Sequence, residues 1–348
     1  YKRQVDNSKQ PNSRWYSGSG IYRDVNLWTG KGVYISHDKL RITTLSVNDD
    51  MAVLEVCAQL KNIIGHGLEA ECLIEIKKDG QKAASNTQRV VFHSEQMQTV
   101  RVQIPIEQPK KWSPAQPALY ECHITTRFDD EICDEAVSNF GIRVLALDPV
   151  HGLQINGETV KLRGTCIHHD NGVIGAETFK EAEWYRCKRL KEAGFNAIRS
   201  AHHPMSRAML DACDHIGMLV MDELTDMWDK EKNTYDFSDI FEDEYNQWIN
   251  HMVEKDYNHP SVVIYSVGNE IQEAGTKQGA WINRILCNKF HELDNTRYTT
   301  NALNGLNCAG RRLSVIMRDV AEKFGMDSHG SGSGGGSNAL NSFMSLMS

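Results

Sequence analysis

The sequence lacks the features that would place the chain in a membrane or on a nucleic acid. No apolar run approaches the roughly 18 residues that a membrane-spanning helix needs. Basic residues are in the minority, at 38 against 46 acidic ones, which leaves a net charge of −8. A negatively charged protein repels nucleic acid and anionic lipid. We therefore predict neither as a partner.

Signatures of disulfide frameworks and zinc sites are missing as well. The nine cysteines form no CxxC pair and no Cys/His spacing typical of zinc. Several stand in apolar strand-like or helical contexts, as Cys57 and Cys187 do, which is typical of reduced core thiols. This favours a reducing cytoplasm over secretion. The chain begins at Tyr1 without an apolar signal segment, so we expect any export signal to lie upstream.

The first structural pattern along the sequence is a series of short segments typical of β-strands. The chain has 348 residues, of which 40% are hydrophobic and 24% charged, and this suits a globular protein of two or three domains. Residues 29–146 contain apolar residues at period two, separated by turn residues such as Asp79-Gly80. This pattern predicts an immunoglobulin-like β-sandwich. The expected strands are Val33–Ile35, Ala52–Leu60, Leu68–Lys77, Thr99–Ile104, Tyr120–Phe128 and Glu135–Gly141.

The pattern changes near Asp148-Pro149, and residues 147–327 alternate apolar strands with amphipathic helices. Such alternation indicates a parallel sheet. About five strands can be counted, whereas a closed (β/α)₈ TIM barrel needs eight and roughly 250 residues, so the barrel is predicted to be incomplete. Residues 328–348 have a Gly/Ser-rich linker composition. The expected strands are Val160–Gly164, Ala197–Ser200, Met218–Asp222, Val262–Val267 and Tyr298–Asn301, and the helices Thr178–Ala193, Ser206–Ile216, Phe241–Tyr257 and Gln278–Leu293.

Ionisable and amide side chains gather just after the first four strands of this region. Barrels of parallel strands place their chemistry at the C-terminal strand ends. Four successive strand ends with such groups indicate an active site. The residues are His168, His169, Asp170, Arg199, His202, His203, Asp222, Glu223, Asn269 and Glu270.

Glu270 is the strongest single candidate. It follows the apolar run Val262–Val267 and the dipeptide Gly268-Asn269. A carboxyl group at the mouth of a buried strand is partly desolvated, which suits a general acid. Asn269 adds an amide able to hydrogen-bond a sugar hydroxyl. The alternative is a solvated glutamate that opens a helix, where the helix dipole favours it.

The other candidates allow more than one interpretation. The pairs His168-His169 and His202-His203 offer metal-type ligands, but adjacent histidines leaving a strand point in opposite directions. This favours hydrogen bonding to a sugar or a structural role over a metal site. Arg199 lies inside a strand, where its charge needs a carboxylate partner.

Trp228, after the third strand, suits either a sugar-stacking platform or ordinary packing.

Taken together, these segments resemble glycoside hydrolase family 2, the family of β-galactosidase, β-glucuronidase and β-mannosidase. The matching stretches occur in the family's order between residues 13 and 270. They are Ser13–Val25, Phe140–Arg143, Leu162–Gly164 with His168, Asn196–Arg199 with His202 and Pro204, Met221–Glu223, and Asn258–Ser261 leading to Gly268-Asn269-Glu270.

The resemblance implies a jelly-roll sugar-binding domain, of which residues 1–28 are the C-terminal remnant, then the immunoglobulin-like domain and the TIM barrel. It also implies a retaining exo-β-glycosidase that acts on a carbohydrate substrate, and it allows a homo-oligomeric full-length protein.

For individual side chains, the resemblance implies that Glu270 is the general acid/base and that Asn269 binds the sugar near its 2-hydroxyl. His168 and His202 would line the glycone subsite, and Arg199 would face the nucleophile.

Two departures from the family pattern qualify this expectation. Retaining hydrolysis needs a second carboxyl group as nucleophile, about 5–5.5 Å from the acid/base. No segment after Asn301 looks like the strand that carries it, so we expect the chain alone to be inactive.

Some family members bind Mg²⁺ after the third strand. Here Met227 and Asp229 stand near those places, and Met is a poor ligand for a hard cation, so we predict no metal and no cofactor.

The segments His168–Ala176 and Asp222–Trp228 look most like those of bacterial β-galactosidases. We therefore expect β-D-galactosides rather than β-glucuronides, with β-mannosides behind. Two other classes stay open: a non-catalytic carbohydrate-binding or scaffold protein, and an unrelated β/α enzyme that uses the histidine pairs on a metal.

Overall fold

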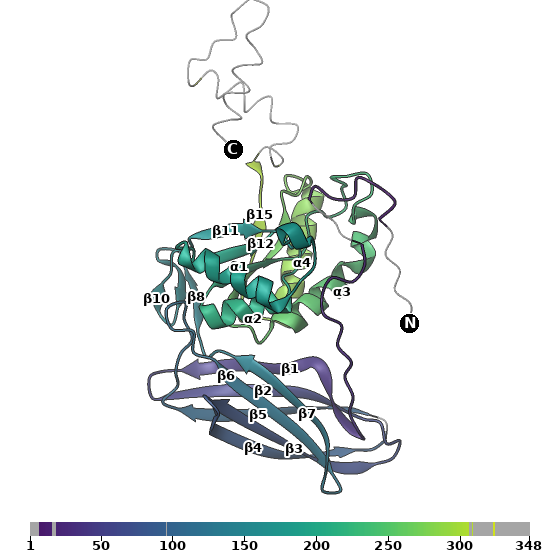
Figure 1. Cartoon of the computed structure of the whole chain (residues 1–348), viewed down its shortest axis with the longest axis vertical. Coiled ribbons are helices and arrows are strands. Elements are labelled where there is room, and N and C mark those ends of the chain that lie inside the picture. The colour runs from purple at the N-terminus through teal and green to yellow at the C-terminus, as the bar shows by residue number, and fades with distance from the viewer. Residues whose placement is uncertain (1–6, 16–18, 95, 306–307, 309–322, 324–348) are drawn as a thin grey trace, which may run out of the picture.

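A computed structural model describes residues 7–15, 19–94, 96–305, 308 and 323 of the chain. It contains a β-sandwich and, stacked against one end of it, an α/β unit built on a parallel sheet (Figure 1). The predicted fold class, an immunoglobulin-like sandwich followed by an incomplete TIM barrel, is confirmed. The predicted linker 328–348 and parts of the expected jelly-roll remnant (residues 1–6 and 16–18) lie outside the described residues.

The sandwich consists of two antiparallel sheets. One has the order β1-β2-β5 and the other β4-β3-β6-β7. Buried and partly exposed residues alternate along β2, as period two requires when one face of a sheet meets the core. Asp79 and Gly80 both have positive φ angles (52° and 77°) and form the tight turn between β3 and β4. The strands are β1 (Val33–Val47), β2 (Met51–Asn62), β3 (Leu68–Lys78), β4 (Gln81–Phe92), β5 (Met97–Glu107), β6 (Tyr120–Phe128) and β7 (Glu131–Phe140).

Strand β4 has no counterpart among the expected strands. Its sequence is mostly polar, and only Phe92 at its end is buried. It nevertheless pairs with β3 along its whole length, from Leu68 opposite Phe92 to Lys78 opposite Gln81. The cross-strand hydrogen bonds and the preceding turn therefore define this strand, rather than a hydrophobic pattern of its own.

The first barrel strand was expected at Val160–Gly164, and this placement is wrong. The structure has β11 at Gly164–Ile167. Val160 instead donates its N–H to the Leu153 carbonyl, so this apolar run extends a small antiparallel sheet that was not predicted. That sheet contains β8 (Leu145–Asp148), β9 (Gly152–Ile155) and β10 (Glu158–Thr159).

The α/β unit has five parallel strands in the sequential order β11-β12-β13-β14-β15, which is the order of a TIM barrel. The remaining strands are β12 (Ala197–Ser200), β13 (Leu219–Glu223), β14 (Val262–Asn269) and β15 (Tyr298–Ala302). The helices are α1 (Lys180–Glu192), α2 (Arg207–Ile216), α3 (Ser238–Asp256) and α4 (Lys277–Leu293).

Helix α2 shows how local sequence sets these boundaries. The Ser206 hydroxyl accepts a hydrogen bond from the Met209 N–H at 3.2 Å and caps the N-terminus. Gly217 ends the helix in the left-handed conformation, with φ of 74°. A Cβ atom at this glycine would lie 2.4 Å from the Pro114 carbonyl oxygen, so only glycine fits.

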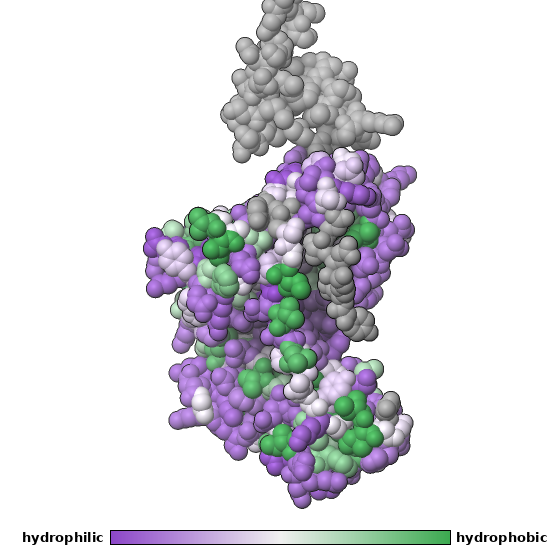
Figure 2. All heavy atoms as spheres, turned by 45° about the vertical axis from the view of Figure 1, so that its right-hand side comes forward, coloured by the Kyte–Doolittle hydropathy of each residue, from purple (hydrophilic) through white to green (hydrophobic). Residues whose placement is uncertain are grey.

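The face of the molecule seen in Figure 2 is largely hydrophilic, with apolar side chains in scattered groups. All nine cysteines are unbridged, and four of them are buried: Cys72, Cys122, Cys187 and Cys213. Within the described ranges, no helix combines the length and the apolar character needed to cross a bilayer.

Candidate active site

The C-terminal ends of the parallel strands meet around one open pocket. The five residues to which the family resemblance assigns a role all line it, together with two residues of the N-terminal segment that precedes the sandwich. The parallel pairing of β11 through β14 brings their ends to the same edge of the sheet, which is why residues a hundred positions apart meet. The lining residues are Arg14, Trp15, His168, Arg199, His202, Asn269 and Glu270.

Arg199 has the carboxylate partner that its position in a strand requires, and the partner is Glu223. The guanidinium donates to both Glu223 oxygens at distances of 2.7 to 3.0 Å. Glu223 is fully buried, and it also contacts His202 Nδ1 at 2.6 Å and accepts a hydrogen bond from the Ser266 hydroxyl at 2.6 Å. Such bidentate pairs hold a guanidinium in one orientation. From beneath the pocket, Glu223 therefore fixes both Arg199 and His202 in the pocket lining.

A second buried carboxylate, Asp226, holds Asn269. The Asn269 amide accepts from Arg199 Nη2 and donates to Asp226 Oδ1, both at 2.8 Å. Asp226 also pairs with Lys232 at 2.9 Å and with Arg14 at 2.8 Å. Burial alone would raise the pKa of Asp226, but the hydrogen bonds from Lys232 and Asn269 hold it below its usual range. The amide of Asn269 is thus fixed from both sides.

Glu270 differs from these carboxylates because it reaches solvent. Its side chain is 43% exposed, and its φ angle of 44° is unusual for a residue other than glycine. The backbone N–H donates to the Ala302 carbonyl at 2.7 Å, which ties this turn to β15. The carboxylate accepts from the Asn304 amide at 3.1 Å and lies 3.9 Å from Arg14 Nη1. This geometry presents a carboxyl group to the pocket, in reach of a ligand.

Two imidazoles and an indole form one wall of the pocket. The Trp15 ring lies 5.0 Å from the His168 ring and 5.5 Å from the His202 ring. Burial, and secondarily the neighbouring His202, lowers the pKa of His168. The wall therefore offers aromatic faces and imidazole hydrogen-bonding groups, which suit the apolar faces and hydroxyls of a sugar ring.

The second histidine of each pair points the other way, as expected. His169 stacks with Tyr22 at 5.6 Å between ring centroids and meets His203 edge-on at 4.8 Å. Burial lowers the pKa of His203 to about 3, so this imidazole is neutral. His169 and His203 belong to the contact between the N-terminal segment and the barrel.

The surroundings of Trp228 and of the histidine pairs separate the interpretations that the sequence left open. Trp228 is fully buried and donates its indole N–H to the Val267 carbonyl at 2.9 Å, so it packs in the core and is no sugar platform. Among the described residues, one set of three or more metal-type ligands comes together, namely Asp211, Asp214 and His259. The histidine pairs of the pocket are not part of it.

Four residues of this network were not predicted from the sequence: Arg14, Trp15, Asp226 and Lys232. Glu223 was among the strand-end candidates, but its pairing with Arg199 was not predicted. Arg14 and Trp15 carried no signal that points to the barrel, because the contact between Arg14 and Asp226 joins residues 212 positions apart.

Comparison with known proteins identifies the family. The model of the TIM barrel domain of glycosyl hydrolases family 2 matches residues 150–328, and a second model of the same family matches residues 33–143. The chain belongs to glycosyl hydrolases family 2.

Individual relatives agree with this family. β-Galactosidase BoGH2A of Bacteroides ovatus is 35% identical over 77% of the chain, and a β-glucuronidase of Bacteroides fragilis is 27% identical over 82%. These matches cover 32% and 42% of the two relatives, so the chain spans well under half of their length.

Solved structures show the same relationship. A family 2 member from Bacteroides cellulosilyticus has a TM-score of 0.81 and 35% identity, with 86% of this chain and 39% of that chain covered. A β-glucuronidase of Bacteroides uniformis has a TM-score of 0.76 and 25% identity, with 88% and 39% covered.

Proposed function

We propose that this chain is part of a retaining exo-β-glycosidase in which Glu270 is the general acid/base. The observation that carries the proposal is the contrast among the carboxylates at the strand ends. Glu223 and Asp226 are buried and held by cations, whereas Glu270 is 43% exposed and lines the pocket. A general acid must reach the leaving-group oxygen, and of these three only Glu270 is placed to do so.

The surrounding residues suit the binding of a glycone. Asn269 presents a fixed amide next to Glu270, and a fixed donor or acceptor can discriminate one sugar hydroxyl from another. His168 and His202, with Trp15, supply imidazole hydrogen-bonding groups and aromatic surface. Arg199 contacts Glu223 and Asn269 and thereby holds these sugar-binding groups in place.

We propose a terminal β-D-galactoside as the substrate. The relative BoGH2A is named a β-galactosidase. The charges of the pocket also support a neutral sugar, because both lining arginines already face carboxylates: Arg14 pairs with Asp226 and Arg199 with Glu223. A β-glucuronide is the second candidate, since the Bacteroides fragilis relative is named a β-glucuronidase. Its carboxylate would need a cation from beyond the described residues.

Double displacement also requires a nucleophilic carboxylate about 5–5.5 Å from the acid/base. Among the described residues, the nearby candidates Glu223 and Asp226 are too buried and too firmly held to attack a sugar. We propose that the nucleophile comes from another part of the full-length enzyme and that the 348-residue chain alone hydrolyses neither aryl β-galactoside nor aryl β-glucuronide.

The test uses both the chain and the full-length enzyme that contains it. In the full-length enzyme, Glu270→Gln should lower kcat by about 10²–10⁴-fold for substrates with poor leaving groups and much less for activated aryl glycosides. Added azide should restore turnover of the activated substrates, because an anionic nucleophile needs no general base. Glu231→Gln, at an exposed loop position, is the matched control.

Three results would contradict the proposal. Unchanged activity of Glu270→Gln would remove the acid/base role. Turnover by the 348-residue chain that disappears in Glu270→Gln would show that a nucleophile is already present. Sugar binding without turnover by the full-length protein would indicate a non-catalytic carbohydrate-binding protein instead.

A further inference from the structure

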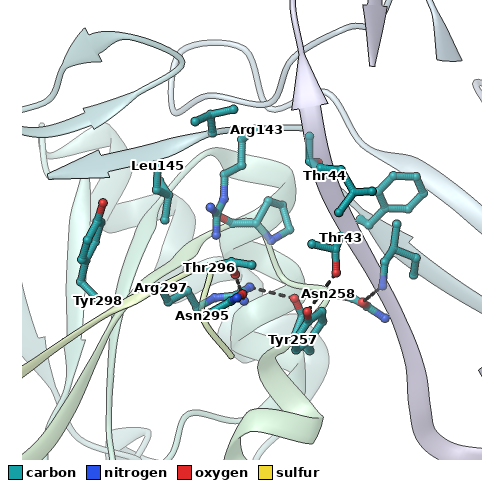
Figure 3. A pocket seen from close by; sticks show the side chains of 16 residues that line it. Thr43, Thr44, Arg143, Leu145, Tyr257, Asn258, Asn295, Thr296, Arg297 and Tyr298 are labelled. Carbon is teal, nitrogen blue, oxygen red and sulfur yellow. Dashed lines mark hydrogen bonds between the residues drawn. The ribbon is translucent and has the colours of Figure 1, made fainter. Parts of the chain in front are cut away.

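A second cleft lies at the opposite end of the barrel strands from the candidate active site. It is formed between the sandwich and the N-terminal ends of these strands (Figure 3). Strand β1, the β7–β8 connection, the loop before β14 and the loop before β15 all line it. Both domains therefore contribute to one polar cleft that the proposed glycosidase mechanism does not use.

The charge of this cleft is unusual for an acidic protein. Its lining contains Arg143 and Arg297 but no aspartate or glutamate, although acidic residues outnumber basic ones in the chain by 46 to 38. Arg297 is compensated, because its guanidinium pairs with Asp294 at 2.6 Å and donates to several backbone carbonyls.

Arg143 lacks such compensation. Its Nε donates to the Pro260 carbonyl at 2.6 Å, and its Nη2 donates to the Val262 carbonyl at 2.8 Å. Within the part of the chain that the structure describes, no carboxylate lies within ion-pair distance of this guanidinium. A half-buried cation that contacts only neutral carbonyls is an unfavourable arrangement unless an anion joins it.

The electrostatics of the guanidinium agree with this geometry. Burial, and then the neighbouring Arg297, lowers the pKa of Arg143 to about 9. Asp294, Asp214 and Tyr265 act in the opposite direction and do not restore its usual value.

Space and further polar groups are available at the end of this side chain. Figure 3 shows Arg143 extending into the cleft toward the turn of Asn295 and Thr296, with Thr44 on the sandwich side. By contrast, Thr43 and Asn258 are engaged in contacts between the domains: Thr43 Oγ1 lies 2.9 Å from the Tyr257 hydroxyl, and Asn258 binds the backbone of β1.

We propose that this cleft binds a small oxyanion, of the phosphate, sulfate or carboxylate type, through the free edge of the Arg143 guanidinium. Asn295 and Thr44 would add an amide and a hydroxyl from the two sides. Because the two domains both line the cleft, the bound anion would strengthen their contact and stabilise the folded chain.

The experiment measures binding of inorganic phosphate, sulfate and acetate to the full 348-residue chain by calorimetry and by thermal unfolding, with chloride at equal ionic strength as the reference. We expect saturable binding at one site and a rise in Tm that chloride does not produce. Comparison of phosphate and sulfate with acetate distinguishes a tetrahedral anion from a carboxylate. Arg143→Gln should weaken binding by about tenfold or more, because a charge-assisted bidentate contact is lost.

Asn295→Ala and Thr44→Val should each weaken binding by a smaller factor while leaving the carbonyl contacts of Arg143 intact. These two variants decide the question if Arg143→Gln does not fold. Arg101→Gln, on the exposed face of β5, is the control for general loss of positive charge.

The proposal is overturned if the anions act only through ionic strength, or if Arg143→Gln, Asn295→Ala and Thr44→Val all bind sulfate as the parent chain does. Loss of binding in Arg14→Gln, with full binding in the cleft variants, would place the anion in the candidate active site instead.

Discussion

Replacing Glu223 with Gln should destabilise the barrel substantially, although Glu223 lies beneath the pocket rather than in it. The carboxylate is fully buried and accepts three contacts from Arg199 at 2.7 to 3.0 Å. It also meets His202 and Ser266, each at 2.6 Å. Glutamine keeps the shape but removes the negative charge and turns one acceptor into an N–H₂ group that faces the guanidinium. Arg199 would keep Asn269 as a neutral partner.

The magnitude follows from the burial of the pair. Removing one partner of a buried ion pair destabilises a protein by about 3–5 kcal/mol, because the other charge is left without compensation. The Arg199 side chain is 22% exposed, so water can solvate part of it. We therefore expect a loss near the lower end, about 3 kcal/mol. Against a typical total stability of about 5–15 kcal/mol, this is easily measured.

The assay is urea unfolding followed by tryptophan fluorescence, with Glu55→Gln as the matched control. Glu55 pairs with Arg101 at 3.2 Å, but Arg101 is largely exposed, and such surface pairs contribute about 0–1 kcal/mol. The double variant Arg199→Met/Glu223→Leu should recover much of the loss, since it removes both buried charges. If Glu223→Gln and Glu55→Gln differ by less than about 1 kcal/mol, the reasoning from burial is wrong.

Three further predictions concern other parts of the fold. The pKa of His203 is about 3 in the folded chain and about 6.5 when unfolded, so its contribution to stability should be present above pH 6.5 and decrease as the pH falls toward 3. In His203→Gln, the free energy of unfolding should therefore fall less steeply between pH 6.5 and 3. Gly217→Ala should lower Tm clearly more than Gly157→Ala, because both have positive φ but only Gly217 meets a backbone atom at the new Cβ, and equal shifts would count against this. Trp228→Phe should lower the free energy of unfolding in urea by about 1–3 kcal/mol, because the buried Val267 carbonyl loses its donor. An unchanged unfolding midpoint would show that water replaces the indole.

Much of the candidate site was predictable because its residues stand next to strong local patterns. Asn269 ends an eight-residue strand that is almost wholly buried, and Glu270 follows it directly. His168 and His202 follow neighbouring parallel strands. Parallel strand ends share one edge of a sheet, so position along the sequence indicated proximity in space. The need of Arg199 for a carboxylate also followed from its place within a strand.

The identity of that carboxylate did not follow. Asp222 and Glu223 are adjacent, and the pleat of β13 decides which one faces Arg199: Glu223 does, while Asp222 points the other way and pairs with Lys255 at 3.2 Å. Strand β4 was likewise invisible in a polar sequence and exists because β3 provides its hydrogen bonds.

By itself, then, the sequence determined the order of the domains, the parallel sheet and the strand ends that carry the chemistry, because each depends on periodicity within a few residues. The tertiary structure alone decided which distant segments meet. It brought Arg14 and Trp15 to the pocket, and in the described part of the chain it left Arg143 without a carboxylate partner in a cleft between two domains. Such contacts depend on the packing of whole elements, and no local pattern of residues records them.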